Sequence, residues 1–137
     1  MRIALVSVAA ALVFTAACAV DTGAILTGTA AVELGKADTV RAEIHMSAGE
    51  LWIEGGSSRL LDANFRYSER VGRPSVHYDA MGGRGVLTIE SPEKDGLKGN
   101  AKNEWRLRMS SGAPLDLSVS LGAGESHLDL SQITLRA

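Results

Sequence analysis

VRAEIHMSAGELWIE, residues 40–54, and LDLSVSLGAGESHLD, residues 115–129, are the two stretches that decide the fold of this chain. In each stretch apolar and polar residues alternate, a run of small residues interrupts the pattern, and alternation then resumes. A period of two is typical of a β-strand that buries one face and exposes the other to water. Each stretch therefore predicts two half-buried strands that meet at a glycine-containing corner.

The two stretches also form an internal repeat. Residues 48–50 (AGE) recur as residues 123–125 at an offset of 75, and the apolar positions before them align as well. Glycine can take a positive φ, and small residues allow stacked turns to approach closely. The repeat predicts stacked strands in a β-roll or solenoid-like arrangement. Two similar hairpins within one sandwich are the alternative, because repeat arrays usually need about three units for stability.

The rest of the chain supports an all-β fold of short stacked strands. Residues 105–109 alternate in the same way, and glycine-rich clusters such as residues 82–85 separate the alternating runs. The polar residues 91–103 are typical of an exposed loop, and the pattern predicts about eight or nine short strands. The expected core face comprises Ile44, Met46, Ile53, Leu87, Ile89, Leu107, Leu117, Val119, Leu121, Leu128 and Leu130.

Composition excludes several classes of protein. The chain has 137 residues, which is enough for one domain, and 45% of them are hydrophobic, which argues against intrinsic disorder. The formal net charge of −2 argues against a strongly basic nucleic-acid-binding protein. A single cysteine excludes a disulfide scaffold and a zinc site built from several cysteines.

The N-terminus is typical of a targeting segment. Residues 1–17 are predicted to be a signal peptide, because they contain one early charge followed by an apolar stretch. This stretch is shorter than the roughly 20 residues that a transmembrane helix needs. Residues 15–18 (TAAC) resemble a bacterial lipobox, so Cys18 is the candidate lipid-anchor residue and the new N-terminus of the mature chain. Ala19 follows, and in lipoproteins the absence of Asp there favours the outer membrane. Simple secretion and an uncleaved anchor are the alternatives.

The domain organisation follows from that segment. Residues 1–17 form the signal peptide, residues 18–36 hold the lipidated Cys18 and a tether, and residues 37–137 form the β domain. The tether is expected because residues 21–36 are rich in Gly, Thr and Ala and show little periodicity.

The residues that could carry chemistry show no catalytic or metal-binding pattern. Glu125, His127 and Asp129 alternate on one strand face and could be drawn as a metal site, but a solvated face explains them as well. Glu50 and Glu125 could be paired carboxylates of a glycosidase, yet the repeat already accounts for their equivalence. We therefore expect no catalytic residue, no bound metal and no cofactor.

Two tryptophans differ in their phase. Trp105 shares the phase of the apolar residues of its run, which predicts a place in the core, whereas Trp52 is out of phase with Leu51 and Ile53. Trp52 is therefore the candidate ligand-binding residue, because an outward aromatic ring can stack on a sugar.

Five pieces of the sequence, residues 47–67, 73–79, 85–92, 104–131 and the closing ITLRA, follow one another in a characteristic order and spacing. In that order and spacing they resemble the toast-rack N-terminal domain family of bacterial cell-envelope proteins. The resemblance implies an all-β fold of stacked strands, related to β-roll or solenoid-like envelope proteins of which some are adhesin-like, and it implies no catalytic residues. Such proteins usually continue with further corner-and-strand units, whereas this sequence ends within a strand-like stretch, and an uncapped strand invites pairing with another chain.

Together these observations predict a non-catalytic, exported envelope protein that Cys18 anchors to the outer membrane or another periplasm-facing membrane. Its expected partners are the membrane, an envelope protein or the cell wall, and a second copy through a strand edge, but no nucleic acid. A carbohydrate-binding module using Trp52 is the first alternative. An enzyme acting on envelope polymers through Glu50 or Glu125 is the second.

Overall fold

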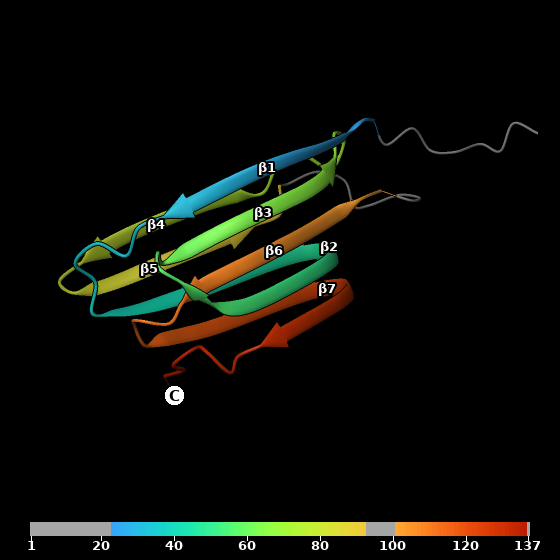
Figure 1. Ribbon diagram of the computed structural model, residues 1–137. Helices are drawn as coiled ribbons and strands as arrows, with labels where there is room; N and C mark the ends of the chain where they lie inside the picture. Colours follow the sequence, from blue (N-terminus) through green and yellow to red (C-terminus); the bar gives the residue numbers. More distant parts are fainter. Residues whose placement is uncertain (1–22, 93–100, 137) are drawn as a thin grey trace, which may run out of the picture.

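The computed structural model describes residues 23–92 and 101–136 (Figure 1). All of the regular secondary structure in these ranges is β-strand. This confirms the all-β prediction. The described residues form seven strands rather than the expected eight or nine, because each repeated stretch continues through its corner as one strand. The strands are β1 (Ile25–Val32), β2 (Thr39–Ser57), β3 (Leu61–Ser68), β4 (Ser75–Met81), β5 (Arg84–Glu90), β6 (Asn103–Ser110) and β7 (Leu115–Asp129).

Strand β2 connects two layers of one continuous sheet. The strand order is β1-β3-β6-β2-β5-β4, with β7 on the other side of β2. The first half of β2 pairs in parallel with β5, and its second half pairs in parallel with β6. Because β2 bends between these halves, the layer with β1, β3 and β6 lies in front of the layer with β4 and β5 (Figure 1). Apolar side chains from both layers fill the space between them.

Strand β7 repeats the bend of β2 directly beside it. The two strands pair in parallel from Val40 opposite Leu115 to Glu54 opposite Asp129, in one register across the corner. The internal repeat therefore produces two neighbouring bent strands, not two separate hairpins. This arrangement places equivalent residues of the two copies side by side.

Glycine is required at the corners. Gly49 has a φ of 140° and Gly124 a φ of 124°, a region that side chains with a Cβ rarely adopt. A Cβ on Gly124 would also collide with the carbonyl oxygen of Gly49 in the neighbouring strand. The buried Asn103 supports the corner, because its Nδ2 donates to the Ala48 oxygen at 2.7 Å and its Oδ1 accepts from Trp105 Nε1 at 2.9 Å.

The core matches the predicted face except on β7 and at Leu130, which is only partly buried. The predicted core residues of β2, β5 and β6 are buried, as is Trp105. On β7, Leu117, Val119 and Leu121 are only partly buried and Leu128 is 46% exposed. The prediction was wrong for these positions because β7 is an edge strand of the described sheet. Alternation of apolar and polar residues shows which face of the sheet a side chain lies on, but it does not show whether the strand lies at the centre or at the edge of the sheet.

The predicted tether also needs correction. Residues 25–32 form β1, which pairs antiparallel with β3 from Ile25 opposite Ser68 to Val32 opposite Leu61. Apolar and polar residues alternate only weakly along β1, because most of its residues are exposed at the edge of the layer. For this reason the sequence of β1 resembles that of a linker. The predicted signal peptide, Cys18 and the beginning of the tether lie outside the described residues.

One side of the molecule is closed by side chains. The Tyr78 hydroxyl on β4 donates to the Leu34 carbonyl oxygen at 2.9 Å, and Arg73 Nη2 donates to the Thr29 oxygen on β1 at 2.7 Å. The first bond joins β4 to the segment that follows β1, and the second joins the segment that precedes β4 to β1. The opposite side ends at β7. Within residues 23–92 and 101–136 no helix has the length and apolar character needed to cross a membrane.

Candidate functional site

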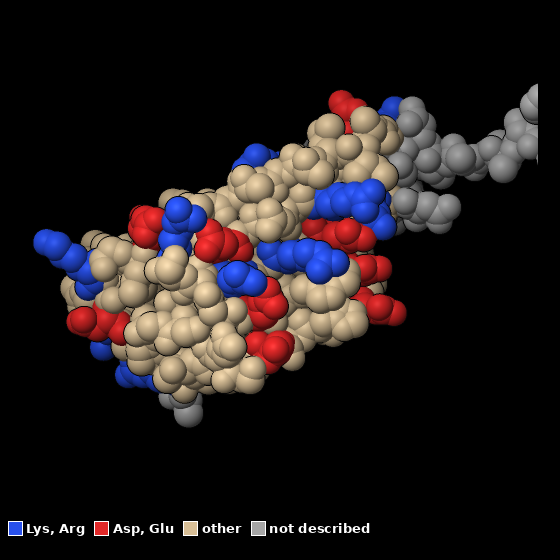
Figure 2. All heavy atoms as spheres, viewed as in Figure 1, with Lys and Arg blue, Asp and Glu red and all other residues tan. Residues whose placement is uncertain are grey.

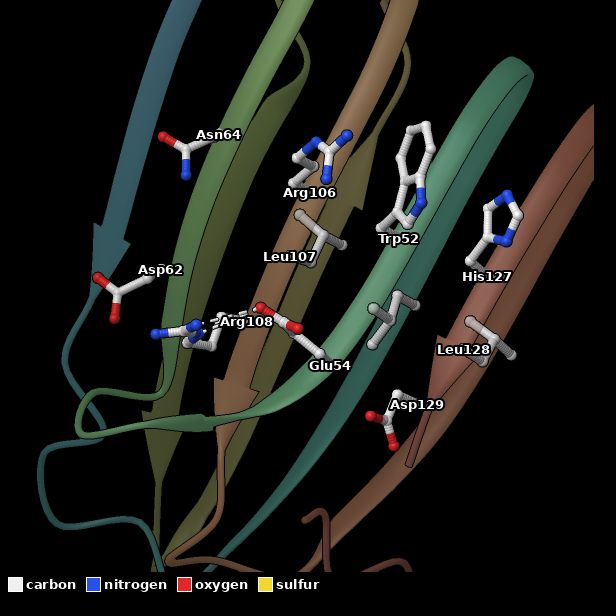
Figure 3. A pocket seen from close by; sticks show the side chains of 11 residues that line it. Trp52, Glu54, Asp62, Asn64, Arg106, Leu107, Arg108, His127, Leu128 and Asp129 are labelled. Carbon is white, nitrogen blue, oxygen red and sulfur yellow. Dashed lines mark hydrogen bonds and ion pairs between the residues drawn. The ribbon is translucent and has the colours of Figure 1, made fainter. Parts of the chain in front are cut away.

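The outer face of the front layer carries polar side chains in two rows that cross four strands. The β-sheet register places Asn64 of β3, Arg106 of β6, Trp52 of β2 and His127 of β7 at one level. Alternate residues of a strand point to the same face, so the next row lies two residues away on each strand. Figure 3 shows both rows.

Trp52 is the centre of the first row, and neighbouring side chains cover both of its faces. The His127 ring stacks on the indole with a centroid distance of 5.2 Å and an interplanar angle of 13°. On the side of β6, the Arg106 guanidinium carbon lies 4.4 Å from the indole centroid (Figure 3). The indole is half-buried as a result. No face of Trp52 is left free to stack on a sugar in this arrangement, so only its edge reaches solvent.

The second row contains three carboxylates and one guanidinium. Arg108 Nη2 lies 3.3 Å from Glu54 Oε1, and Asp62 and Asp129 flank this pair on the neighbouring strands. The hydroxyl of Ser57 donates to Asp62, and this bond together with Arg59 lowers the pKa of Asp62 below its usual value.

Asp129 is held in a similar way at the other end of the row. Hydrogen bonds from the Ser131 hydroxyl and backbone N–H lower the pKa of Asp129. Both aspartates therefore stay ionised at neutral pH, and neither has the raised pKa that a general acid needs.

These rows line an open concavity of about 590 Å³. Acidic and basic groups alternate on this side of the molecule, so no patch of a single sign dominates (Figure 2). The surface can hold a ligand through several hydrogen bonds and charge pairs. Its lining residues are Trp52, Ile53, Glu54, Asp62, Asn64, Arg106, Leu107, Arg108, His127, Leu128 and Asp129.

The other carboxylates considered from the sequence lie elsewhere. Glu50 and Glu125 are direct partners in the β2–β7 register, close to the corner, and neither lines the concavity. Among the residues that the structure describes, no three or more His, Cys, Asp or Glu side chains gather in a way that could hold a metal ion.

Sequence reasoning placed Trp52 on the outer face but missed most of its neighbours. The offset of the internal repeat contained the signal for His127, because it aligns Trp52 with that residue. Arg106 and Asn64 could not be found in this way. They come from strands outside the repeat, and their register depends on the tertiary fold.

Comparison with known proteins gives one match to a family and several to solved structures. The model of the N-terminal domain of toast-rack matches residues 21–137. The crystal structure of a candidate cell adhesion protein from Clostridium sporogenes is similar, with 30% sequence identity and a TM-score of 0.77. A candidate adhesin from Bacteroides fragilis has 10% identity and a TM-score of 0.40, which is too low for any argument. No curated protein matches the chain.

These structures are longer than the matched region. The alignment with the Clostridium sporogenes protein covers 82% of this chain and 55% of that chain, and the alignment with the Bacteroides fragilis protein covers 77% and 44%. The chain therefore spans about half the length of the solved structures that it matches.

Proposed function

The chain belongs to the family of toast-rack N-terminal domains, and from this membership we propose that it is a non-catalytic, lipid-anchored contact domain of the bacterial envelope. Cys18 carries the anchor, and the domain faces the periplasm or the exterior. The outer face around Trp52 makes contacts with an envelope protein or with the cell wall. The stacked bends of β2 and β7 form the solenoid-like part of the fold.

The observation that carries this proposal is the concave face of paired polar side chains. It combines donors such as Arg106 with carboxylates such as Glu54, and both aspartates in it have lowered pKa values. Such a surface is suited to binding rather than to proton transfer. The resemblance to a candidate cell adhesion protein supports the same role.

The lipid anchor is tested by metabolic labelling with a palmitate analogue in an expressing bacterium. We expect label on the chain with its natural Cys18 and none on the Cys18→Ala variant, because this is the only thiol in the chain. Membrane fractionation should change in parallel. Equal fractionation and no label in either chain would contradict the anchor and leave a secreted domain.

A carbohydrate ligand is the second candidate, because hydrogen-bonding side chains line the concavity beside an aromatic edge. We expect peptidoglycan fragments or envelope polysaccharides to change tryptophan emission in a saturable way. Trp105 is buried, so the change should come from Trp52 and disappear in Trp52→Phe.

One variant and its control test the contribution of the Arg106 side chain to glycan binding. Arg106→Ala should weaken glycan binding by about tenfold, since it removes a charged donor worth about 1.5 kcal/mol. Arg41→Ala, on the rear layer outside the concavity, is the matched control and should bind like the unmodified chain. An emission spectrum unaffected by every glycan would remove this candidate.

A further inference from the structure

The charge on the concave face changes from one row of side chains to the next. The first row holds Asn64, Arg106, Trp52 and His127, and its only permanent charge is the Arg106 guanidinium. The second row holds three carboxylates and one guanidinium, that of Arg108 (Figure 3). Residues two apart on a strand are separated by about 6.4–6.8 Å. A ligand that lies across both rows therefore meets a cation and a surplus of carboxylates at about this separation.

Arg106 is held in place by an aromatic ring but has no anionic partner among the described residues. Its guanidinium carbon lies 4.4 Å from the centroid of the Trp52 indole, an arrangement that is favourable for a cation. No carboxylate of residues 23–92 or 101–136 forms an ion pair with it, whereas Arg108 pairs with Glu54 at 3.3 Å. The planar fork of N–H donors fits a carboxylate. Because the indole already restricts this side chain, binding a carboxylate costs less conformational entropy.

The second row provides acceptors for a cation. Glu54 and Asp129 are direct partners in the β2–β7 register, so two negative charges lie side by side on the outer face. Arg108 donates to Oε1 of Glu54, and the hydroxyl and N–H of Ser131 donate to Oδ1 of Asp129. The other oxygen of each carboxylate has no hydrogen-bond partner within the described part of the chain. A cation over this pair would reduce the repulsion between the two carboxylates.

Carboxylates on both sides of the first row disfavour a polyanionic ligand. On the side away from the second row, the register brings three carboxylates to the outer face, and two cations offset part of their charge. A polymer with one negative charge per unit would meet carboxylates on either side of Arg106, whereas a single carboxylate need not. The carboxylates are Glu50, Glu104 and Glu125, and the cations are Arg66 and Lys102.

We propose that the concavity binds the carboxyl end of a peptide whose last residue is a diamino acid. The carboxylate lies on Arg106 in the first row, and the side-chain ammonium lies on Glu54 and Asp129 in the second row. A lysine-type side chain has a flexible four-carbon stem, which can span the distance between the rows. This proposal rests on the proposed contact role and names the part of the cell wall that is bound, its peptide rather than its glycan.

The charges favour the peptide over the glycan. A neutral sugar gains most from an open aromatic face, and both faces of Trp52 are covered by His127 and Arg106. Charge-assisted hydrogen bonds are about twice as strong as neutral ones. The two rows offer such bonds to a ligand that carries both a carboxylate and an ammonium group.

Nuclear magnetic resonance of the full chain with two matched peptides tests the carboxylate. The chain has two tryptophans and therefore two indole N–H signals. The signal of Trp52 reports on the concavity, and that of the buried Trp105, which donates to Asn103, is an internal control. We expect N-acetyl-alanyl-lysine with a free carboxylate to shift the Trp52 signal in a saturable way. Its C-terminal amide should bind about tenfold more weakly.

Matched variants test each end of the ligand. Arg106→Gln should weaken binding of the free acid by about tenfold, whereas Arg84→Gln, on β5 of the rear layer, should leave it unchanged. Replacing lysine by norleucine removes the ammonium group and should weaken binding by about threefold. Asp129→Asn should abolish this preference for lysine, and it leaves Arg108 paired with Glu54.

Three results would each overturn the proposal: equal binding of the acid and the amide, equal effects of Arg106→Gln and Arg84→Gln, or no shift of the Trp52 signal at about 10 mM peptide. Saturable binding of glycan fragments alone would also overturn it and would leave the proposed contact role intact. The labelling of Cys18 tests the anchor separately, because the peptide experiment uses no membrane.

Discussion

At the scale of single residues, Gly124 is constrained both by its own backbone and by its neighbour. Its φ of 124° is unfavourable for residues with a Cβ, and the space that a Cβ would fill belongs to the Gly49 carbonyl. The repeated AGE motif is therefore a requirement of two bends stacked in register. The sequence predicted this corner correctly because a glycine between two alternating runs is typical of a backbone position with positive φ.

We expect Gly124→Ala to lower the free energy of unfolding by about 1–3 kcal/mol, because it adds backbone strain and a collision between neighbouring strands. Urea denaturation followed by tryptophan fluorescence measures the change. Gly112→Ala is the control, since Gly112 has no positive φ and a Cβ there would make only an ordinary contact with Ser110. Equal stability of the two variants would contradict the corner geometry.

The side chains that surround Trp52 in the candidate site could not be predicted from the phase of single residues. Phase alone placed Trp52 outward, but it could not reveal that His127 and Arg106 cover the indole. These contacts depend on parallel pairing between strands distant in sequence. A pattern within one strand carries no information about that pairing.

At the scale of elements, the position of a strand in the sheet decides how deeply its apolar face is buried. Strand β2 has neighbours on both sides and buries its inward residues almost completely, whereas β7 does not. The alternation of the two strands is the same, so the sequence predicted the same burial for both. The same limit explains why β1, an edge strand of small residues, was expected to be a tether.

A pair of matched substitutions measures this difference. Ile44→Asp should unfold the domain, because it buries an unpaired charge at a fully buried site. Strand phase alone predicts the same result for Val119→Asp. Since Val119 is only partly buried on an edge strand of the described residues, we expect a loss of only about 1–2 kcal/mol. Thermal unfolding by circular dichroism distinguishes them, and equally severe effects would show that β7 is covered in the monomer.

At the scale of the whole molecule, two hydrogen bonds on the side opposite β7 tie β4 and the segment before it to β1 and the segment after it. Tyr78 is the more buried of the two donors, and its burial raises the pKa of its hydroxyl above the usual value. The hydroxyl therefore stays neutral and remains a donor to Leu34 at neutral pH. The chain itself also joins the layers, at the bends of β2 and β7 and where it passes from β3 to β4 and from β5 to β6.

We expect Tyr78→Phe to cost about 0.5–1.5 kcal/mol of stability, the usual net value of one hydrogen bond. The raised pKa also predicts a pH dependence. The contribution of Tyr78 is complete below the pKa of an unfolded tyrosine and is lost as the pH rises through the higher folded value. Denaturation at neutral and alkaline pH checks both points. A Tyr78→Phe variant that loses as much stability with rising pH as the unmodified chain would contradict this assignment.

The separation of β2 and β7 in the sequence also affects folding during synthesis. Val40 is synthesised 75 residues before its partner Leu115. At about 5–20 residues per second, the second edge of β2 therefore waits for about 4–15 s before the strand that covers it exists. Parallel pairing over such a separation is slow to form. Pairing with β7 is thus the step that covers this edge of β2, and a chain that stalls before residue 115 presents an unpaired edge along the longest described strand.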